Sequence, residues 1–227
     1  MSTLDHARGV TSLAGTAGSA GGAVLAAAAR TIAAVRPASK PLHPQGRVRK
    51  ACLYRHGLSP ELGVPWLDMA GIDEVVVRES RAIGLPGALP DIHGLAVRVP
   101  VGDGTSGDLL FASTGWGRVS RFVLTASREP GGRPMTTLLP YRTPAGPLLL
   151  GARLIGDQTV ELSCSVDQGD WRHFADLRLS DEDAGDPDVS FDPVRNQLPG
   201  LDQYRMVERL REPAYAQARA SRGESES

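Results

Sequence analysis

Residues 160–164 read V-E-L-S-C and residues 174–179 read F-A-D-L-R-L, and both segments alternate apolar with polar side chains. A period of two is typical of a β-strand that buries one face. Strand-like segments recur at short spacing, at 49–55, 74–79, 93–99, 108–113, 119–126, 135–139, 148–154, 159–165 and 171–179. Because turn-forming clusters and not helices separate them, they predict an antiparallel barrel or sandwich of about eight strands. A closed barrel would also remove the exposed sheet edges.

Helices are expected at the two ends of this strand-rich region. Residues 20–35 are rich in alanine and predict an N-terminal helix, while residues 209–222 (R-L-R-E-P-A-Y-A-Q-A-R-A-S-R) predict a C-terminal one. Pro213 lies inside the second helix and should kink or restart it. The predicted fold class is therefore α+β. The expected division of the chain is a frayed or disordered N-terminus over 1–19, a single barrel domain over 20–222 and a disordered tail over 223–227.

Composition excludes several classes of function. The 227 residues carry a formal net charge of −1 and no dense basic run, which disfavours a nucleic-acid partner. Two cysteines, Cys52 and Cys164, fit neither a disulfide framework nor a zinc or iron–sulfur site, so a reducing, cytoplasmic setting is expected with both buried. Residues 9–29 lack charge but are mostly Gly, Ala, Ser and Thr, too weakly apolar for a membrane span. A secretory signal peptide is the weaker alternative for this segment.

The C-terminal helix places three chemically notable residues on one stripe. Arg211 precedes Tyr215 by four residues, and Arg222 follows it by seven. A guanidinium one turn away favours the phenolate form of the tyrosine, and a phenolate is a suitable ligand for ferric iron, including haem iron. Arg222 would lie about 10 Å further along the axis, near the distance from a haem iron to its propionates. The alternative is an ordinary surface helix.

The order of several motifs resembles the haem catalases, and the chain length resembles the small catalase-related haem peroxidases that keep only the barrel core. The segments F-D-P-V-R-N-Q-L-P-G-L (191–201) and R-E-P-A-Y (211–215) are similar to the proximal segment of that family. This resemblance implies haem b (iron protoporphyrin IX) as the cofactor. It also implies Tyr215 as the axial iron ligand, Arg211 as its phenolate partner and Arg222 as a propionate-binding cation.

Two segments on the N-terminal side of the barrel resemble the distal part of the family. K-P-L-H-P-Q-G (40–46) is similar to the distal motif and V-R-E-S (77–80) resembles V-R-F-S. The resemblance implies that His43 lies over the haem and exchanges protons with peroxide, while Ser80 hydrogen-bonds that histidine. It further implies that Lys40 or Arg78 neutralises a haem propionate.

Two later segments complete the resemblance. P-D-I-H-G-L-A-V-R-V (90–99) resembles a family strand in which His93 takes the place of an arginine and is expected to be structural. G-D-L-L-F-A-S-T (107–114) is similar to W-D-L-V-G-N-N-T, with Ala112 and Ser113 at the two asparagines. The resemblance implies that Ser113 replaces an asparagine that donates a hydrogen bond to peroxide. A serine has a shorter reach and one donor, which predicts weak or absent catalase activity.

The predicted function is a haem-dependent peroxidase that uses hydrogen peroxide or an organic hydroperoxide. Its partners would be the peroxide and a small organic reductant, with no nucleic acid and a homodimer as one assembly. Three alternatives stay open at this point: a haem-free barrel that binds an apolar small molecule, a haem carrier or sensor without turnover, and a haem enzyme that rearranges or cleaves hydroperoxides.

Overall fold

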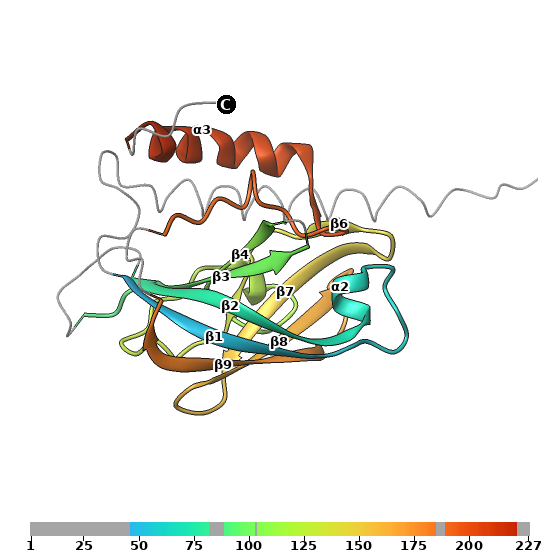
Figure 1. The fold of residues 1–227 in the computed structure, drawn as a ribbon, viewed down its shortest axis with the longest axis horizontal. Helices are drawn as coiled ribbons and strands as arrows, with labels where there is room; N and C mark the ends of the chain where they lie inside the picture. Colours follow the sequence, from blue (N-terminus) through green and yellow to red (C-terminus); the bar gives the residue numbers. More distant parts are fainter. Residues whose placement is uncertain (1–45, 82–88, 103, 185–188, 222–227) are drawn as a thin grey trace, which may run out of the picture.

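The computed structural model of this chain describes residues 46–81, 89–102, 104–184 and 189–221 (Figure 1). Eight antiparallel strands close into a barrel in the order β1-β2-β3-β4-β5-β7-β8-β9, and β9 pairs back with β1. These strands are β1 Gly46–His56, β2 Ala70–Arg81, β3 His93–Val101, β4 Thr105–Ser113, β5 Met135–Thr136, β7 Gly146–Leu154, β8 Thr159–Val166 and β9 Arg172–Asp183. The predicted antiparallel barrel of about eight strands is confirmed. Two short strands, β6 Tyr141–Thr143 and β10 Asp202–Gln203, extend the sheet from β7.

Alternation along the strands divides the barrel into an apolar inside and a more polar outside. On β2 the side chains of Val75 and Val77 are buried in the core, whereas Arg78 and Ser80 point the other way. A single cluster of apolar side chains fills the interior. Its fully buried members include Leu53, Val77, Val97, Leu109, Leu148, Leu150, Leu162, Phe174 and Leu177. Such packing makes the barrel interior a core and not a channel.

Helices are few among the described residues. The short α2 (Pro65–Asp68) follows β1, and the Asp68 carboxylate accepts hydrogen bonds from the backbone N–H groups of Leu62 and Val64, both at 2.8 Å. The C-terminal α3 spans Arg205–Ser221 and continues through Pro213, so the expected restart at this proline does not occur. The predicted N-terminal helix over 20–35 lies outside the described residues. In the part of the chain that is described, no helix is both long and apolar enough to cross a membrane.

The predicted strand over 119–126 is wrong. The 3₁₀ turn η1 (Ser120–Phe122) stands there, followed by an isolated bridge between Thr114 and Leu124. Arg121 is buried in this turn, and its guanidinium donates to the Ser165 hydroxyl at 2.6 Å. Arg121 and Phe122 are adjacent and both buried. A regular strand does not allow this, because it sends neighbouring side chains to opposite faces.

Candidate functional site

Three neighbouring strands present a strip of mostly small side chains, with one arginine, on the outside of the barrel. The register sets Arg78 of β2 opposite Ala96 of β3, and Ser80 opposite Gly94, which in turn faces Ala112 of β4. Partners in an antiparallel pair point to the same side, so these five residues share one face. We call them the outer strip. It brings together Arg78 and Ser80, two of the residues that the sequence proposed for a haem site.

Gly94 and Ser80 approach each other closely inside the outer strip. A Cβ atom added to Gly94 would lie 2.9 Å from the Ser80 hydroxyl oxygen. Arg78 is half-buried, and its burial lowers the pKa of the guanidinium. The chain enters β1 beside this group, because Gly46 is the Cα partner of Ser80. Of the other proposed distal residues, Lys40 and His43 lie outside the described residues.

Ser113 does not belong to the outer strip. Strand alternation turns it away from the face of Ala112, and it is fully buried. Its hydroxyl accepts a hydrogen bond from the backbone N–H of His93 at 3.1 Å and donates one to the carbonyl of Thr125 at 2.7 Å. The expectation that Ser113 faces peroxide is therefore corrected to a structural role between β3 and the following loop. Ala112 occupies the outward position on β4.

His93 has the structural role that the resemblance implied. The residue is buried, and its Nε2 atom lies 3.0 Å from the carbonyl oxygen of Ser127. His93 also lines a small hollow of about 130 Å³ between the ends of β2 and β3 and residues of β5, β7 and β8, namely Met135, Leu154 and Val160. Drug-sized ligands occupy pockets of about 300–1,000 Å³, so this hollow is too small to be a porphyrin pocket.

A buried carboxylate fastens the chain after residue 189 to the outside of β4. Asp108 accepts two hydrogen bonds from Arg98, at 2.8 and 2.7 Å, and one from the Asn196 side-chain amide at 2.8 Å. The backbone N–H of Asp192 donates to the same carboxylate at 2.7 Å. Four charge-assisted or amide hydrogen bonds on one buried carboxylate give this attachment a defined geometry.

Beyond this attachment the chain turns into α3, which Figure 1 shows on one side of the barrel past the crossing segment. The start of α3 packs through Val207, with Tyr204 and Leu210, against Leu139. The crossing segment also fits closely against β4, since a Cβ atom on Gly107 would come within 2.3 Å of the Leu198 side chain. These contacts place α3 on the side of the barrel that carries Asp108.

Tyr215 is half-buried on α3, and its phenol lies within electrostatic range of Asp108 and Asp192. Burial raises the pKa of this phenol, and the two carboxylates and Tyr141 raise it further, while the Arg211 guanidinium lowers it. The net direction is upward. The sequence analysis predicted the direction of the Arg211 effect on this pKa correctly. It did not predict that burial has the larger effect.

Arg211 has a second aromatic partner that the sequence did not indicate. Tyr141 on β6 is buried, and the Arg211 guanidinium lies close enough to lower the pKa of its phenol. Burial still raises the pKa of Tyr141 despite this guanidinium. Tyr141 was missed because its strand is only three residues long. The structure thus groups Arg211 with two phenols beside Asp108, while Arg222 lies outside the described residues.

Comparison with solved structures finds the fold of this chain in catalases. A bacterial catalase matches with a TM-score of 0.55 and 10% identity, over 83% of this chain and 58% of that one. Catalase A from Saccharomyces cerevisiae matches with a TM-score of 0.56 and 9% identity, over 82% and 62%. A fungal catalase matches with a TM-score of 0.54 and 8% identity, over 81% and 59%.

These matches show a catalase-like fold. The chain spans between 58% and 62% of the length of these three catalases. No protein-family model matches the sequence, and no curated protein matches it either.

Proposed function

We propose that this chain binds haem b through Tyr215 and acts as a haem-dependent peroxidase on hydrogen peroxide or an organic hydroperoxide. The observation that carries the proposal is the placement of the Arg211 and Tyr215 pair within electrostatic range of Asp108 on β4. That strand also contributes to the outer strip with Arg78 and Ser80. A catalase-like fold supports the same assignment.

The donor set fits haem in three respects. A phenol is one of the few protein groups that ligate haem iron. The half-buried Arg78 offers a cation to a propionate, as Lys40 and Arg222 would. Gly94 has no side chain and Ala112 has only a methyl group, so part of the outer strip has a flat surface. A flat surface favours a flat ligand over a bulky one.

When bound, ferric haem would supply the redox centre for cleavage of the peroxide O–O bond. The chain's own task is then to move a proton from one peroxide oxygen to the other. A neutral His43 can accept that proton and return it. His43 precedes Gly46, the partner of Ser80, by three residues, a reach of about 10 Å at most. Within that reach Ser80 can accept a hydrogen bond from the imidazole and fix its tautomer.

The absence of an amide on the outward face of β4 favours peroxidase over catalase activity. Ala112 has no polar atom in its side chain, and Ser113 is turned inward with its hydroxyl engaged by backbone groups. Within the described residues, β4 therefore supplies no side-chain donor to the outer strip. The chain would therefore orient a second peroxide molecule less well, which favours an organic reductant as the second substrate.

The spectrum of haem-loaded protein tests the proposal most directly. We expect a Soret band with the features of high-spin ferric iron bound by tyrosinate, and Tyr215→Phe should lose it. Tyr204→Phe is the matched control on the same segment, and Tyr141→Phe tests the other phenol beside Arg211. Retention of the tyrosinate spectrum in Tyr215→Phe, or its loss only in Tyr141→Phe, would reject Tyr215 as the ligand.

A second variant tests the proton transfer. His43→Ala should keep the haem spectrum but slow the reaction with hydrogen peroxide by about 100-fold or more, because general acid–base catalysis contributes about that much. Stopped-flow absorbance after mixing with peroxide measures the rate. An unchanged rate would remove His43 from the mechanism.

A colourless protein after expression with added haem would favour the alternative of a haem-free barrel that binds an apolar small molecule. The interior argues against that function, because the described core is filled by fully buried side chains such as Leu53, Leu150 and Phe174. Product analysis with an organic hydroperoxide separates the remaining haem functions. A reduced alcohol with oxidised co-substrate indicates a peroxidase, whereas a rearranged or cleaved product indicates an isomerase or lyase.

A further inference from the structure

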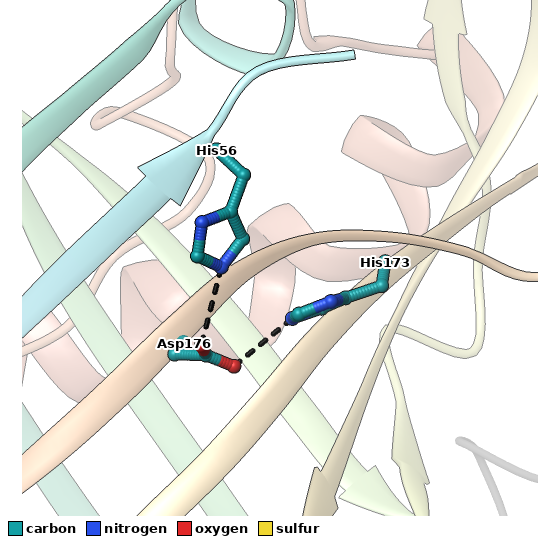
Figure 2. Close-up of side chains that lie close together, drawn as sticks. All are labelled: His56, His173 and Asp176. Carbon is teal, nitrogen blue, oxygen red and sulfur yellow. Dashed lines mark hydrogen bonds and ion pairs between the residues drawn. The ribbon is translucent and has the colours of Figure 1, made fainter. Parts of the chain in front are cut away.

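Two imidazoles and one carboxylate, from His56, His173 and Asp176, converge at the surface of the barrel (Figure 2). The Nε2 atom of His56 lies 3.1 Å from Oδ2 of Asp176, and the Nε2 atom of His173 lies 2.9 Å from Oδ1 of the same carboxylate. The three ligand atoms all lie within 4.8 Å of one another. The two rings meet edge to face with centroids 4.9 Å apart.

A β-bulge on β9 creates this convergence. His173 and Asp176 are three residues apart, a spacing that a regular strand sends to opposite faces. The pairing with β8 shifts between Ala175 and His173, which leaves Phe174 without an opposite residue. Phe174 and Ala175 consequently both point into the core, and both are fully buried. The extra residue turns His173 outward on the side of Asp176, an effect that β-bulges often have beside functional sites.

His56 completes the group from the neighbouring strand. It is the last residue of β1, and β1 pairs with β9 so that Tyr54 and Arg55 lie opposite Asp176 and Ala175. All three side chains are therefore held by strands of a closed sheet and not by a loop. Sites built on strands position their ligands more accurately than sites on loops.

We propose that His56, His173 and Asp176 form a binding site for a divalent transition-metal ion such as Zn²⁺. Two imidazole nitrogens and a carboxylate suit Zn²⁺, Ni²⁺, Co²⁺ and Cu²⁺, and disfavour Mg²⁺ and Ca²⁺, which prefer oxygen ligands. Each nitrogen–oxygen pair, at 3.1 and 2.9 Å, would subtend an angle near 90° at an ion about 2.1 Å from both atoms. Both imidazoles would bind through Nε2 after exchanging their hydrogen bonds to the carboxylate for bonds to the metal.

The surroundings leave coordination positions open. His56 and His173 are exposed and Asp176 is half-buried, so water or a small anion can complete the shell. The carbonyl oxygen of Ala175 lies 3.1 Å from Nε2 of His173 and adds an oxygen on the same side. The nearby Arg178 stacks on Tyr54 at 4.8 Å from the ring centroid, which gives its positive charge another partner.

This site is independent of the proposed haem site. His56 ends β1, while Gly46 begins the strand beside Ser80. Because β1 is eleven residues long, the two positions lie about 30 Å apart along the strand. Metal binding at His56 can therefore be measured whether or not the chain takes up haem.

The test uses the untagged full-length protein, freed of bound metal with a chelator and dialysed. Isothermal titration with Zn²⁺ should show one site per chain. Co²⁺ should give a visible absorption band that Zn²⁺ abolishes. Titration with Mg²⁺ should show no binding in the same range. His56→Gln, His173→Gln and Asp176→Asn should each weaken Zn²⁺ binding by at least about 100-fold, because loss of even an outer partner of a metal ligand costs 10–100-fold.

Asp157→Asn is the matched control, since Asp157 is an exposed carboxylate outside the group, and it should bind Zn²⁺ as the parent does. The three ligand variants alter outward-facing side chains, and circular dichroism checks that each keeps the parental fold. Zn²⁺ should also raise the melting temperature of the parent and of Asp157→Asn but not of His173→Gln. Stoichiometric binding that survives all three ligand substitutions, or no Zn²⁺ binding by the parent, would overturn the proposal.

Discussion

The Asp108 carboxylate is the point at which the barrel holds the C-terminal segment, and its removal should be costly. In Asp108→Ala the Arg98 guanidinium keeps only its bond to the Ser190 carbonyl, while the donors on Asp192 and Asn196 lose their acceptor. Breaking a buried ion pair by removing one partner costs about 3–5 kcal/mol. Because the Arg98 side chain is still 24% exposed, we expect about 3 kcal/mol, at the lower end.

Urea denaturation followed by circular dichroism measures this loss. With an m value of about 2 kcal/mol/M, a loss of about 3 kcal/mol moves the midpoint down by about 1.5 M. The control is Asp202→Ala, which breaks the exposed pair between Arg142 and Asp202 at 3.0 Å and should cost less than about 1 kcal/mol. Equal midpoints for Asp108→Ala and Asp202→Ala would refute the idea that a buried network fastens the segment.

The same variant distinguishes two effects on haem binding, the attachment of the C-terminal segment to the barrel and the ligation of the iron. Asp108→Ala leaves Arg211 and Tyr215 in the chain but loosens the segment that leads into α3. If haem binding depends on where the barrel holds α3, haem affinity should fall in this variant, although no proposed iron ligand has changed and loss of the carboxylate favours the Tyr215 phenolate. Full haem affinity in Asp108→Ala at a temperature where it is folded would show that α3 finds its position without the carboxylate.

Two further predictions follow from close packing and from burial. Gly107→Ala should lose about 2 kcal/mol of stability in urea because its Cβ would lie 2.3 Å from the Leu198 side chain, whereas Gly102→Ala, with nothing within 4 Å, should change little. Burial raises the pKa of Cys164 to about 11, so at a mildly alkaline pH the native protein should react with a thiol reagent first at the half-buried Cys52. Peptide mapping identifies the labelled cysteine, and early labelling of Cys164 would contradict its burial.

The barrel was predictable because its long strands alternate clearly. The segments predicted at 74–79 and 159–165 lie inside β2 and β8, and the structure extends each by a few residues. The strands of two or three residues were not all visible, since β6 and β10 are too short to show a period. The segment 119–126 failed for a different reason, because burial of the charged Arg121 cannot be inferred from an apolar pattern.

The face of a strand was harder to predict than its existence. On β4 the inward set includes Leu109, Phe111 and Ser113, and the outward set includes Asp108, Leu110 and Ala112, so each set mixes apolar with polar residues. Hydropathy could not tell which set faces the core, and Ser113 was assigned to the wrong side. The pairing register places Ala112, and not Ser113, on the same face as Arg78 and Ser80. This register is known only from the structure.

The metal group was invisible for a related reason. A spacing of three between His173 and Asp176 predicts opposite faces, and nothing in the local composition signals the bulge that reverses this. His56 lies more than a hundred residues earlier and joins the group only through the β1–β9 pairing. A site whose residues are brought together by a β-bulge and by long-range strand pairing is therefore hard to predict from a single sequence.

The phenol of Tyr215 shows how the structure changes the meaning of a correct motif. The spacing of Arg211 and Tyr215 suggested a tyrosine already inclined to lose its proton. In the folded chain, burial outweighs the guanidinium and raises the pKa of Tyr215, and Arg211 is shared with Tyr141. The metal-free protein should therefore hold a neutral phenol at neutral pH, so ligation must release a proton. Arg211 then matters most once the phenolate exists, because a buried anion beside Asp108 and Asp192 needs a cation to offset their repulsion.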